Sequence, residues 1–405
     1  MSEPIKLKRA ITLPMITLYG LGTIIGAGVF VLIGKVAGIA GIYAPLSFLT
    51  ASIIAGFTAF SYAELSSRFP KSAGEAVYLE ETFHRHWLST STGLAGVTIG
   101  TISAATITNG SVGYIQMFVV DLPSWLIITL LVTALALLAG WGISESVGVA
   151  ALTTIVSIIG LVVVVVINAE NLAILPERLP EMVPPNLEVL GIIVFGAFIA
   201  FYAFVGFEDM INVAEEVKDP QRNMPHAIIL ALLITTLLYV LISLTAVLTF
   251  PIETLAASNT PLTDLIGNDR PAIKSIIGIV SIIAIADGTL IQIIKSARIL
   301  YGMSSQKLIP PLFSIVHTAT RTPIIATFTI ATTILFLALT FPLLTLVQFT
   351  SFITLVVFGA INFSLWHLKL RPGTLKNDAF NLPVWMPLIE FMLCMLFVLA
   401  QLKQL

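Results

Sequence analysis

Long apolar runs alternate with short polar segments along almost the whole chain. A helix needs about 20 mostly apolar residues to cross about 30 Å of hydrocarbon, and about eleven runs reach that length. They lie at about 11–33, 41–66, 88–118, 124–142, 147–167, 189–214, 226–249, 272–302, 323–341, 343–367 and 383–402. The runs are too long for the strands of a membrane β-barrel and lack their alternation. The pattern predicts an all-α polytopic membrane protein with about eleven transmembrane helices in a single domain, residues 1–405.

The composition agrees with a chain surrounded by lipid. Of the 405 residues, 57% are hydrophobic and only 10% are charged, whereas soluble domains carry roughly 25% charged residues. The net charge of −2 offers no basic surface for a nucleic acid. The one cysteine, Cys394, cannot form an internal disulfide or a cysteine-based metal site. No paired catalytic acids, nucleophile–base pair or metal cluster stands out in the runs, so we expect neither an enzyme nor a bound cofactor.

Lysine and arginine are distributed unevenly between the two sides that alternating spans define. With the N-terminus in the cytoplasm, about fifteen of them fall on the inner side. The outer side holds five, namely Lys35, Arg178, Arg270, Lys274 and Lys403. Because cytoplasmic loops carry the excess of positive charge, this bias predicts a multi-pass protein of the plasma membrane with a cytoplasmic N-terminus. The first run has no small-residue cleavage site and continues as a full span, so we expect no cleavable signal peptide.

Glycines interrupt the first run at mid-depth, at Gly22, Gly26 and Gly28. Each costs roughly 1 kcal/mol of helix propensity relative to alanine, and a broken backbone is tolerated in lipid only where it lines a cavity or is covered by protein. The alternative is close helix packing, because Gly22 and Gly26 also form a GxxxG pair. The sixth run is similar, since Gly206 lies among aromatic residues and is followed by two carboxylates within the apolar stretch.

The two interrupted runs occupy corresponding places. The first opens one group of five runs and the sixth opens the next group, which starts from the opposite side of the membrane because five is odd. Such a correspondence indicates an inverted-repeat transporter with its binding site at the membrane midplane. The repeats are predicted at about 11–167 and 189–367, with an extra helix at about 383–402. Free N–H groups at a break suit a carboxylate and free carbonyls suit an ammonium group, so the predicted substrate is an α-amino acid.

Four stretches of the chain carry a family resemblance. They are 22–30 (GTIIGAGVF), 62–83 (YAELSSRFPKSAGEAVYLEETF), 201–228 (FYAFVGFEDMINVAEEVKDPQRNMPHAI) and 295–323 (KSARILYGMSSQKLIPPLFSIVHTATRTP). In this order they resemble motifs of the amino acid–polyamine–organocation transporters. The resemblance implies a LeuT-like fold of five plus five helices, in which the first and sixth helices are unwound around the substrate.

The resemblance also implies roles for individual residues, carried over by position. The backbone of the first break would bind the substrate carboxylate, at Ile25, Gly26, Ala27 and Gly28. The backbone of the second break would bind the α-amino group, at Phe201, Ala203 and Phe204. Tyr202 occupies the place where related exchangers present an aromatic gate. In the third span, Asn109 is a candidate for the side-chain pocket.

Ionisable side chains at depth in a membrane are costly and are functional candidates by default. Glu208 lies about 9 Å inward of the centre of the sixth span; it is a proton or gate residue or, alternatively, a hydrogen-bond partner of the first break. Asp209, one residue on, is a candidate for an inner-gate ion pair. Asp287, in the middle of the eighth span, is a proton site, a sodium ligand or a counter-charge for a cationic substrate. An Asp287–Lys295 pair is disfavoured, because eight residues of helix span about 12 Å.

Ser157 in the fifth span completes the coupling candidates. The resemblance places it where some proton-coupled relatives carry a lysine, and its hydroxyl, with Asp287 nearby, would line a sodium or proton site. The alternative is an ordinary helix serine that bonds its own backbone.

The sequence as a whole predicts a secondary active transporter that moves amino acids by alternating access, driven by an inward proton gradient. An exchanger of amino acids or polyamines and a sodium-coupled symporter stay open as alternatives. A non-transporting amino acid sensor is disfavoured, because the sequence has no large polar region for a signalling domain. The expected partners are an amino acid, a proton or sodium ion and the lipid membrane, with no nucleic acid.

Overall fold

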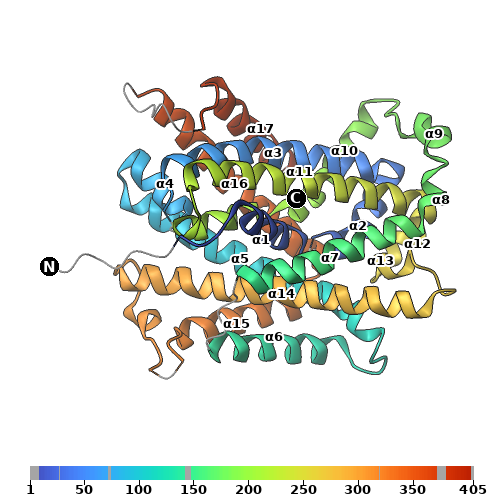
Figure 1. The fold of residues 1–405 in the computed structure, drawn as a ribbon, viewed down its shortest axis with the longest axis horizontal. Helices are drawn as coiled ribbons and strands as arrows, with labels where there is room; N and C mark the ends of the chain where they lie inside the picture. Colours follow the sequence, from blue (N-terminus) through green and yellow to red (C-terminus); the bar gives the residue numbers. More distant parts are fainter. Residues whose placement is uncertain are drawn as a thin grey trace.

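The computed structural model describes residues 9–26, 28–71, 74–141, 147–318, 320–371 and 380–402. Within these ranges the elements are helical, apart from one isolated parallel bridge between Ile11 and Val217. The long helices run roughly parallel across the molecule, and short helices lie toward its ends (Figure 1). The all-α fold class expected from the apolar runs is therefore confirmed.

The first half of the chain contains the first five expected spans. The first span consists of two helices, α1 (Leu13–Ile25) and α2 (Gly28–Ala40), and is followed by η1 (Gly41–Tyr43). The next four are α3 (Ala44–Arg68), α5 (His86–Gln116), α6 (Ser124–Trp141) and α7 (Val147–Ile167). The connecting elements are α4 (Gly74–Phe83), α8 (Ala169–Leu172), α9 (Leu175–Arg178) and η2 (Leu179–Met182).

The second half contains the remaining six. The sixth span consists of α10 (Leu187–Phe201), η3 (Tyr202–Phe204) and η4 (Phe207–Glu216). The others are α11 (Pro220–Thr249), α14 (Pro271–Ser305), α15 (Ile324–Thr340), α16 (Leu343–Lys369) and α17 (Trp385–Leu402). The connecting elements are α12 (Ile252–Ala257), α13 (Pro261–Asp264) and η5 (Pro311–Ser314).

Each expected span coincides with one helix or with an interrupted helix. Eight helical stretches among the described residues are long and apolar enough to cross a membrane, and α1 and α15 are shorter apolar helices. The remaining span, α5, has 31 residues and is rich in glycine, serine and threonine. The first span is longer than the expected 11–33, because α2 resumes after the break and continues through apolar sequence to Ala40.

Buried apolar side chains form two clusters. The smaller joins α5, α6, α14 and α15, and the larger joins α1, α2, α3, α7, α10, α11, α16 and α17 together with further residues of α5 and α14. Both interrupted spans belong to the larger cluster. Since α5 and α14 pack on each other and also contact the interrupted spans, the breaks lie where the two clusters meet.

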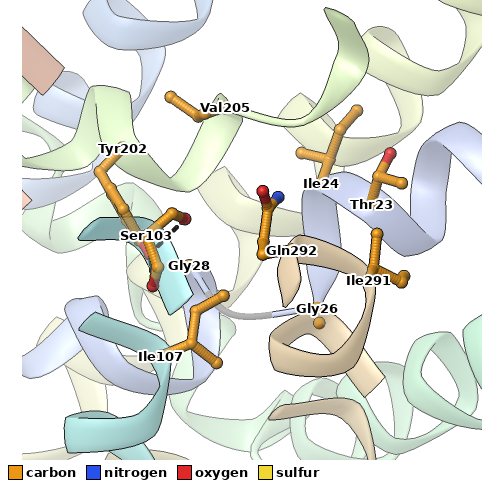
Figure 2. A pocket seen from close by; sticks show the side chains of 11 residues that line it. Thr23, Ile24, Gly26, Gly28, Ser103, Ile107, Tyr202, Val205, Ile291 and Gln292 are labelled. Atoms are coloured by element: carbon orange, nitrogen blue, oxygen red, sulfur yellow. Dashed lines mark hydrogen bonds between the residues drawn. The ribbon is translucent and has the colours of Figure 1, made fainter. Parts of the chain in front are cut away.

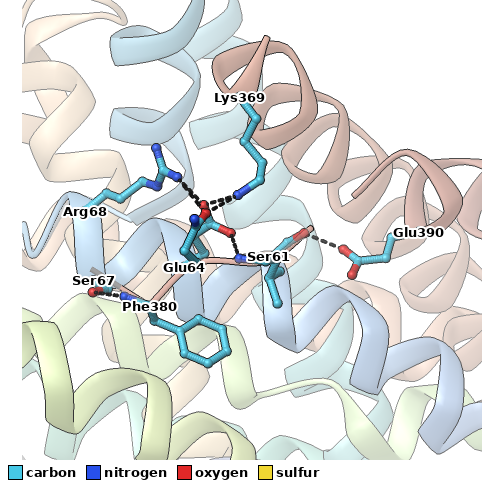
Figure 3. A network of polar contacts seen from close by, with 9 residues as sticks. Ser61, Glu64, Ser67, Arg68, Lys369, Phe380 and Glu390 are labelled. Atoms are coloured by element: carbon cyan, nitrogen blue, oxygen red, sulfur yellow. Dashed lines mark hydrogen bonds and ion pairs between the residues drawn. The ribbon is translucent and has the colours of Figure 1, made fainter. Parts of the chain in front are cut away.

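A buried ionic cluster fixes the C-terminal end of α3. We call it the Glu64 cluster, and it consists of Glu64, Arg68, Lys369 and Asn381. Figure 3 shows Glu64 between Arg68 and Lys369. One oxygen of Glu64 accepts hydrogen bonds from Arg68 and from the Lys369 ammonium, the latter at 2.5 Å, and the other accepts the Leu382 N–H at 2.8 Å. Lys369 also donates to the Asn381 side chain at 2.7 Å, so the cluster ties α3 to α16 and to the segment before α17.

Candidate functional site

The first break separates α1 from α2. The Gly26 N–H donates to the Gly22 carbonyl at 3.0 Å and ends the helix, and α2 begins at Gly28. A Cβ on Gly28 would stand 2.3 Å from the Cα of Ala203, so a glycine is needed where this break touches the second one. A Cβ on Gly22 would stand 2.3 Å from the Thr154 hydroxyl oxygen of α7. Close packing therefore accounts for Gly22, and the break accounts for Gly26 and Gly28.

The second break separates α10 from η4. Gly206 has a φ of +132°, in the region that favours glycine, and a Cβ there would stand 2.4 Å from the Thr23 carbonyl oxygen. The Thr23 hydroxyl donates to the Gly206 carbonyl at 2.9 Å, which ties the two breaks together. Glu208 accepts the Gly206 N–H at 2.8 Å. The Glu208 carboxylate therefore binds the backbone of the second break. One of the alternatives from the sequence was a hydrogen bond to the first break instead.

A small cavity lies between the two breaks, α5 and α14 (Figure 2). Its volume is ≈ 10 Å³, which is room for about one water molecule. The break segments contribute Thr23, Ile24, Gly26, Gly28, Tyr202 and Val205. The helices α5 and α14 contribute Ser103, Ile107, Gly288, Ile291 and Gln292. All of these residues are neutral, and an amino acid would enter only after they move apart.

The predicted binding residues of the breaks divide into two groups. Gly26, Gly28 and Tyr202 line the cavity. The others that the structure describes are buried in the break segments behind its wall: Ile25, Phe201, Ala203 and Phe204. Ala27 lies outside the described residues. The Tyr202 hydroxyl lies 3.0 Å from the Ser103 hydroxyl and donates to the Ser103 carbonyl at 3.2 Å, so Tyr202 closes the cavity against α5.

The predicted pocket residue Asn109 lies on another face of α5. Its amide donates to the Phe341 carbonyl at 3.3 Å, and the cavity is lined instead by Ser103 and Ile107. These two are four residues apart and share one face of the helix. Asn109 is two residues beyond Ile107, which is about 200° around a helix of 3.6 residues per turn. The sequence identified α5 as a helix that lines the site, but not which face of α5 meets the cavity.

Sequence reasoning also overlooked Gln292, the polar side chain that α14 brings to the cavity. The signal was present, because polar residues within a span are functional candidates whether or not they ionise. Gly288 lies one turn before Gln292 and allows α14 to approach the first break. A Cβ on Gly288 would stand 3.3 Å from the Gly26 carbonyl oxygen.

Next to the cavity lies a second ionic group, which we call the Asp209 cluster: Asp209, Gln292 and Lys295. The carboxylate of Asp209 forms an ion pair with Lys295 and accepts the Gln292 amide N–H at 3.3 Å. Asp209 is 2% exposed. The sequence suggested an ion pair for Asp209 without naming a partner, and the structure supplies Lys295.

The predicted coupling residues Asp287 and Ser157 lie outside the cavity wall. Asp287 is partly buried and accepts the Thr153 hydroxyl of α7 at 2.8 Å. Ser157 donates to the Thr153 carbonyl at 2.9 Å, which is the bond to its own helix that the alternative interpretation expected. No group of three or more His, Cys, Asp or Glu side chains in the described ranges could hold a metal ion.

Comparison with known proteins gives consistent matches over almost the whole chain. Residues 11–402 match the model of a family described as amino acid permease. The branched-chain amino acid permease of Bacillus subtilis (strain 168) is 28% identical over 405 residues, which cover 93% of this chain and 84% of that protein. The methylthioribose transporter of the same organism is 28% identical over 424 residues, covering 98% and 89%.

A plant relative is matched over a smaller share of its own length. The mitochondrial cationic amino acid transporter 3 of Arabidopsis thaliana is 29% identical over 385 residues, which cover 89% of this chain but only 62% of the relative. The family and these relatives are transporters and not enzymes. Their names specify three different kinds of substrate, so the likeness does not identify the substrate of this chain.

Proposed function

The chain belongs to the amino acid permease family, and on that premise we propose that it carries an α-amino acid across the plasma membrane by alternating access. The observation that carries the proposal is the pair of breaks that face one cavity. Peptide groups at helix ends lack helical partners. Their N–H and C=O groups complement the carboxylate and the ammonium of a zwitterion, and the side chains that line the cavity carry no charge that would compete with them.

The packing of the helices supports the kind of motion that alternating access requires. The interrupted spans pack on α3 and α11, and α5, α6, α14 and α15 pack on one another. We propose that the first group rocks against the second about the breaks, as expected of inverted-repeat transporters. A cavity of ≈ 10 Å³ corresponds to the closed arrangement between the two open ones.

We propose a proton as the coupling ion, with Glu208 as the residue that carries it. The side chain is 5% exposed, directly follows the second break and accepts the Gly206 N–H. A bond to an ionised acceptor is roughly twice as strong as one to a neutral acceptor. Protonation of Glu208 therefore weakens its hold on the break and links the proton to the movement of η4.

Uptake into proteoliposomes tests this function. Purified protein is reconstituted without sodium, and uptake of the twenty radiolabelled amino acids is measured with and without an inward proton gradient. We expect at least one amino acid to accumulate several-fold with the gradient, and Glu208→Gln to lose the gradient dependence while the exposed control Glu253→Gln keeps it. If no amino acid is transported, the function is wrong. Uptake that is independent of pH and collapses without sodium would refute the proton.

Sodium-coupled symport is the second candidate, and one observation favours it. The oxygens of Asp287 and Thr153 lie together, next to the point where Gly288 meets the first break, and sodium prefers oxygen ligands as other hard cations do. Replacing external sodium by choline separates the candidates. Loss of uptake in choline, together with loss of the sodium response in Asp287→Asn, would select sodium. Counterflow with unlabelled arginine or putrescine inside the vesicles identifies an exchanger.

We also propose that the N-terminus is cytoplasmic, on the basis of the lysine and arginine bias. The exposed residues Glu177 on α9 and Arg85 before α5 then lie on opposite sides of the membrane. A membrane-impermeant maleimide should label Glu177→Cys but not Arg85→Cys in intact cells, because Cys394 is buried. The reverse pattern would invert the topology.

A further inference from the structure

Gln292 presents an unused hydrogen-bond acceptor at the cavity. The side chain is 7% exposed, and its amide reaches between the turn that carries Tyr202 and the end of α1 (Figure 2). The amide nitrogen donates to Asp209, whereas the amide oxygen has no hydrogen-bond partner among the described residues. Buried polar atoms without a partner are uncommon in native proteins, because they have lost their bonds to water. The free oxygen therefore points to a ligand that donates hydrogen bonds.

The other end of the same amide is connected to the Asp209 cluster. One carboxylate oxygen of Asp209 faces the Gln292 amide and the other faces the Lys295 ammonium. Gln292 and Lys295 are three residues apart on α14, so they lie on one face of that helix. A single carboxylate thus holds η4, the segment that follows the second break, against α14. Gln292 is the member of this cluster that also lines the cavity.

The bond between Gln292 and Asp209 is the weaker of the two. Its length of 3.3 Å is beyond the usual 2.7–3.2 Å of an N–H···O hydrogen bond. The amide oxygen packs closely against α5, because a Cβ on Gly100 would stand 3.0 Å from it and 2.3 Å from the Ser296 hydroxyl. The long bond to Asp209 is therefore the contact that the amide gives up most readily.

The chemistry of the cavity indicates which donor the amide oxygen would accept. The ammonium group of an amino acid carries three N–H donors, and the carbonyls of Ile24 and Gly206 at the breaks already accept the hydroxyls of Tyr239 and Thr23. The walls around Gln292 are apolar on several sides, at Ile24, Ile107, Val205 and Ile291. These walls suit an aliphatic side chain, so a neutral amino acid such as L-leucine fits both parts of the site.

We propose that Gln292 recognises the bound substrate. Its amide oxygen accepts a hydrogen bond from the ammonium group of a bound neutral amino acid, and the accompanying turn of the amide releases Asp209 from one of its two partners on α14. Occupancy of the cavity is thereby transmitted to the segment that follows the second break. This inference rests on the proposed function, because it requires that an amino acid binds between the breaks.

A pair of ligands and a pair of variants test the contact. Binding to the purified full-length protein is measured from the thermal stabilisation produced by L-leucine and by its desamino analogue, 4-methylpentanoic acid. Gln292→Leu should weaken the binding of L-leucine about tenfold or more, as expected for a hydrogen bond to a charged group. The binding of the desamino analogue should change less than about twofold. Gln401→Leu is the matched control, since Gln401 is a buried glutamine on α17, and it should leave both ligands unaffected.

A labelling experiment tests the transmission to η4. Ile211 on η4 is 1% exposed, so Ile211→Cys should react slowly with a maleimide and faster when L-leucine is bound. In the double variant with Gln292→Leu, saturating L-leucine should no longer accelerate the reaction. In the double variant with Gln401→Leu, the acceleration should persist. A change in stability alone would not remove the dependence on L-leucine.

The outcomes separate the inference from the function on which it rests. If the wild-type protein binds L-leucine but Gln292→Leu binds it equally well, or loses the desamino analogue to the same extent, the inference is wrong and the transport function stands. The same holds if labelling of Ile211→Cys responds to L-leucine with or without Gln292. If the wild-type protein binds none of the twenty amino acids, the proposed function fails and the inference with it.

Discussion

Two buried ionic clusters in the described part of the chain differ in how completely their carboxylates are bonded. In the Glu64 cluster, both carboxylate oxygens are bonded, and the acid lies between two cations from α3 and α16. In the Asp209 cluster, one acid faces one cation and a long hydrogen bond from Gln292. The first cluster lies away from the breaks, and the second adjoins the cavity. From this difference we expect the Glu64 cluster to stay intact during transport and the Asp209 cluster to open during it.

The energetics of buried charges explain why the two arrangements differ. Taking ions out of water costs several kcal/mol per ion, and only close partners and further hydrogen bonds offset that cost. The Glu64 cluster supplies such partners to both oxygens of its carboxylate. A cluster that must open in each transport cycle, as we expect of the Asp209 cluster, needs fewer hydrogen bonds and ion pairs, because all of them have to be broken each time. The comparison predicts that disruption of the Glu64 cluster affects folding and that disruption of the Asp209 cluster affects transport.

The largest effect on stability is expected from Glu64→Gln. The substitution removes the counter-charge of Arg68 and Lys369, and breaking a buried pair in this way costs about 3–5 kcal/mol. Thermal unfolding in detergent should show a lower transition temperature or loss of the monodisperse protein. Glu81→Gln is the control, because the Lys71–Glu81 pair is exposed and is worth at most about 1 kcal/mol. Equal transition temperatures for the two variants would contradict the comparison.

A large effect on transport is expected from Gly206→Ala. Alanine at a φ of +132° is strained by about 1–3 kcal/mol, and its Cβ would meet the Thr23 carbonyl. Uptake should fall by more than about tenfold. Gly191→Ala on α10 provides the control, because a Cβ there has nothing within 4 Å and alanine favours the helix. If both variants transport normally, the close contact between the breaks is not required for transport.

The breaks could be predicted from the sequence, whereas most of the cavity wall could not. A glycine or a carboxylate inside an apolar run conflicts with the local helix, so Gly26, Gly206 and Glu208 are visible without a structure. Which face of α5 or α14 meets the cavity depends on how each helix is rotated against its neighbours. These long helices have apolar residues on all sides, so their patterns do not show the buried face. Asn109 was therefore chosen where Ile107 faces the cavity.

The ionic partners were equally difficult to predict. Helical rise correctly excluded Lys295 as a neighbour of Asp287. The pairing of Lys295 with Asp209, however, joins two different spans and depends on the tertiary packing of η4 on α14. Sequence spacing carries this kind of information only within one helix. The boundaries of the two repeats, at about 11–167 and 189–367, stay a prediction.

The Asp209 cluster gives the sharpest test of the comparison, because stability and transport should separate there. Lys295→Met removes the cation from Asp209, which keeps the Gln292 amide as a donor. We expect a loss of about 2 kcal/mol, between the values for exposed and fully buried pairs, and a maximal uptake rate reduced about tenfold. Uptake at saturating amino acid, normalised to the amount of folded protein, measures the second effect. A variant less stable than Glu64→Gln that transports at the normal rate would reverse the assignment of the two clusters.

The smallest effect concerns Glu75 on α4, which accepts the Tyr62 hydroxyl at 2.7 Å near the Asp209 cluster. Burial raises the pKa of Glu75 above its ordinary value of 4.5, against the opposing influence of Lys295 and the Tyr62 hydrogen bond, while Asp209 adds to the increase. The folded protein then binds a proton that the unfolded chain releases. Glu75 therefore contributes less to stability as the pH rises above about 4.5.

Glu75→Gln should remove that part of the pH dependence, because a glutamine oxygen can still accept the Tyr62 hydroxyl. The variant should gain slightly in transition temperature relative to the wild type as the pH rises from 5 to 8, in scans of the two proteins side by side. A constant difference between them over this range would mean that Glu75 holds no such proton. Because Lys295 acts on Glu75, the difference should grow in the Lys295→Met background. The pKa of Glu75 would then respond to the charge of the Asp209 cluster, which we expect to open during transport.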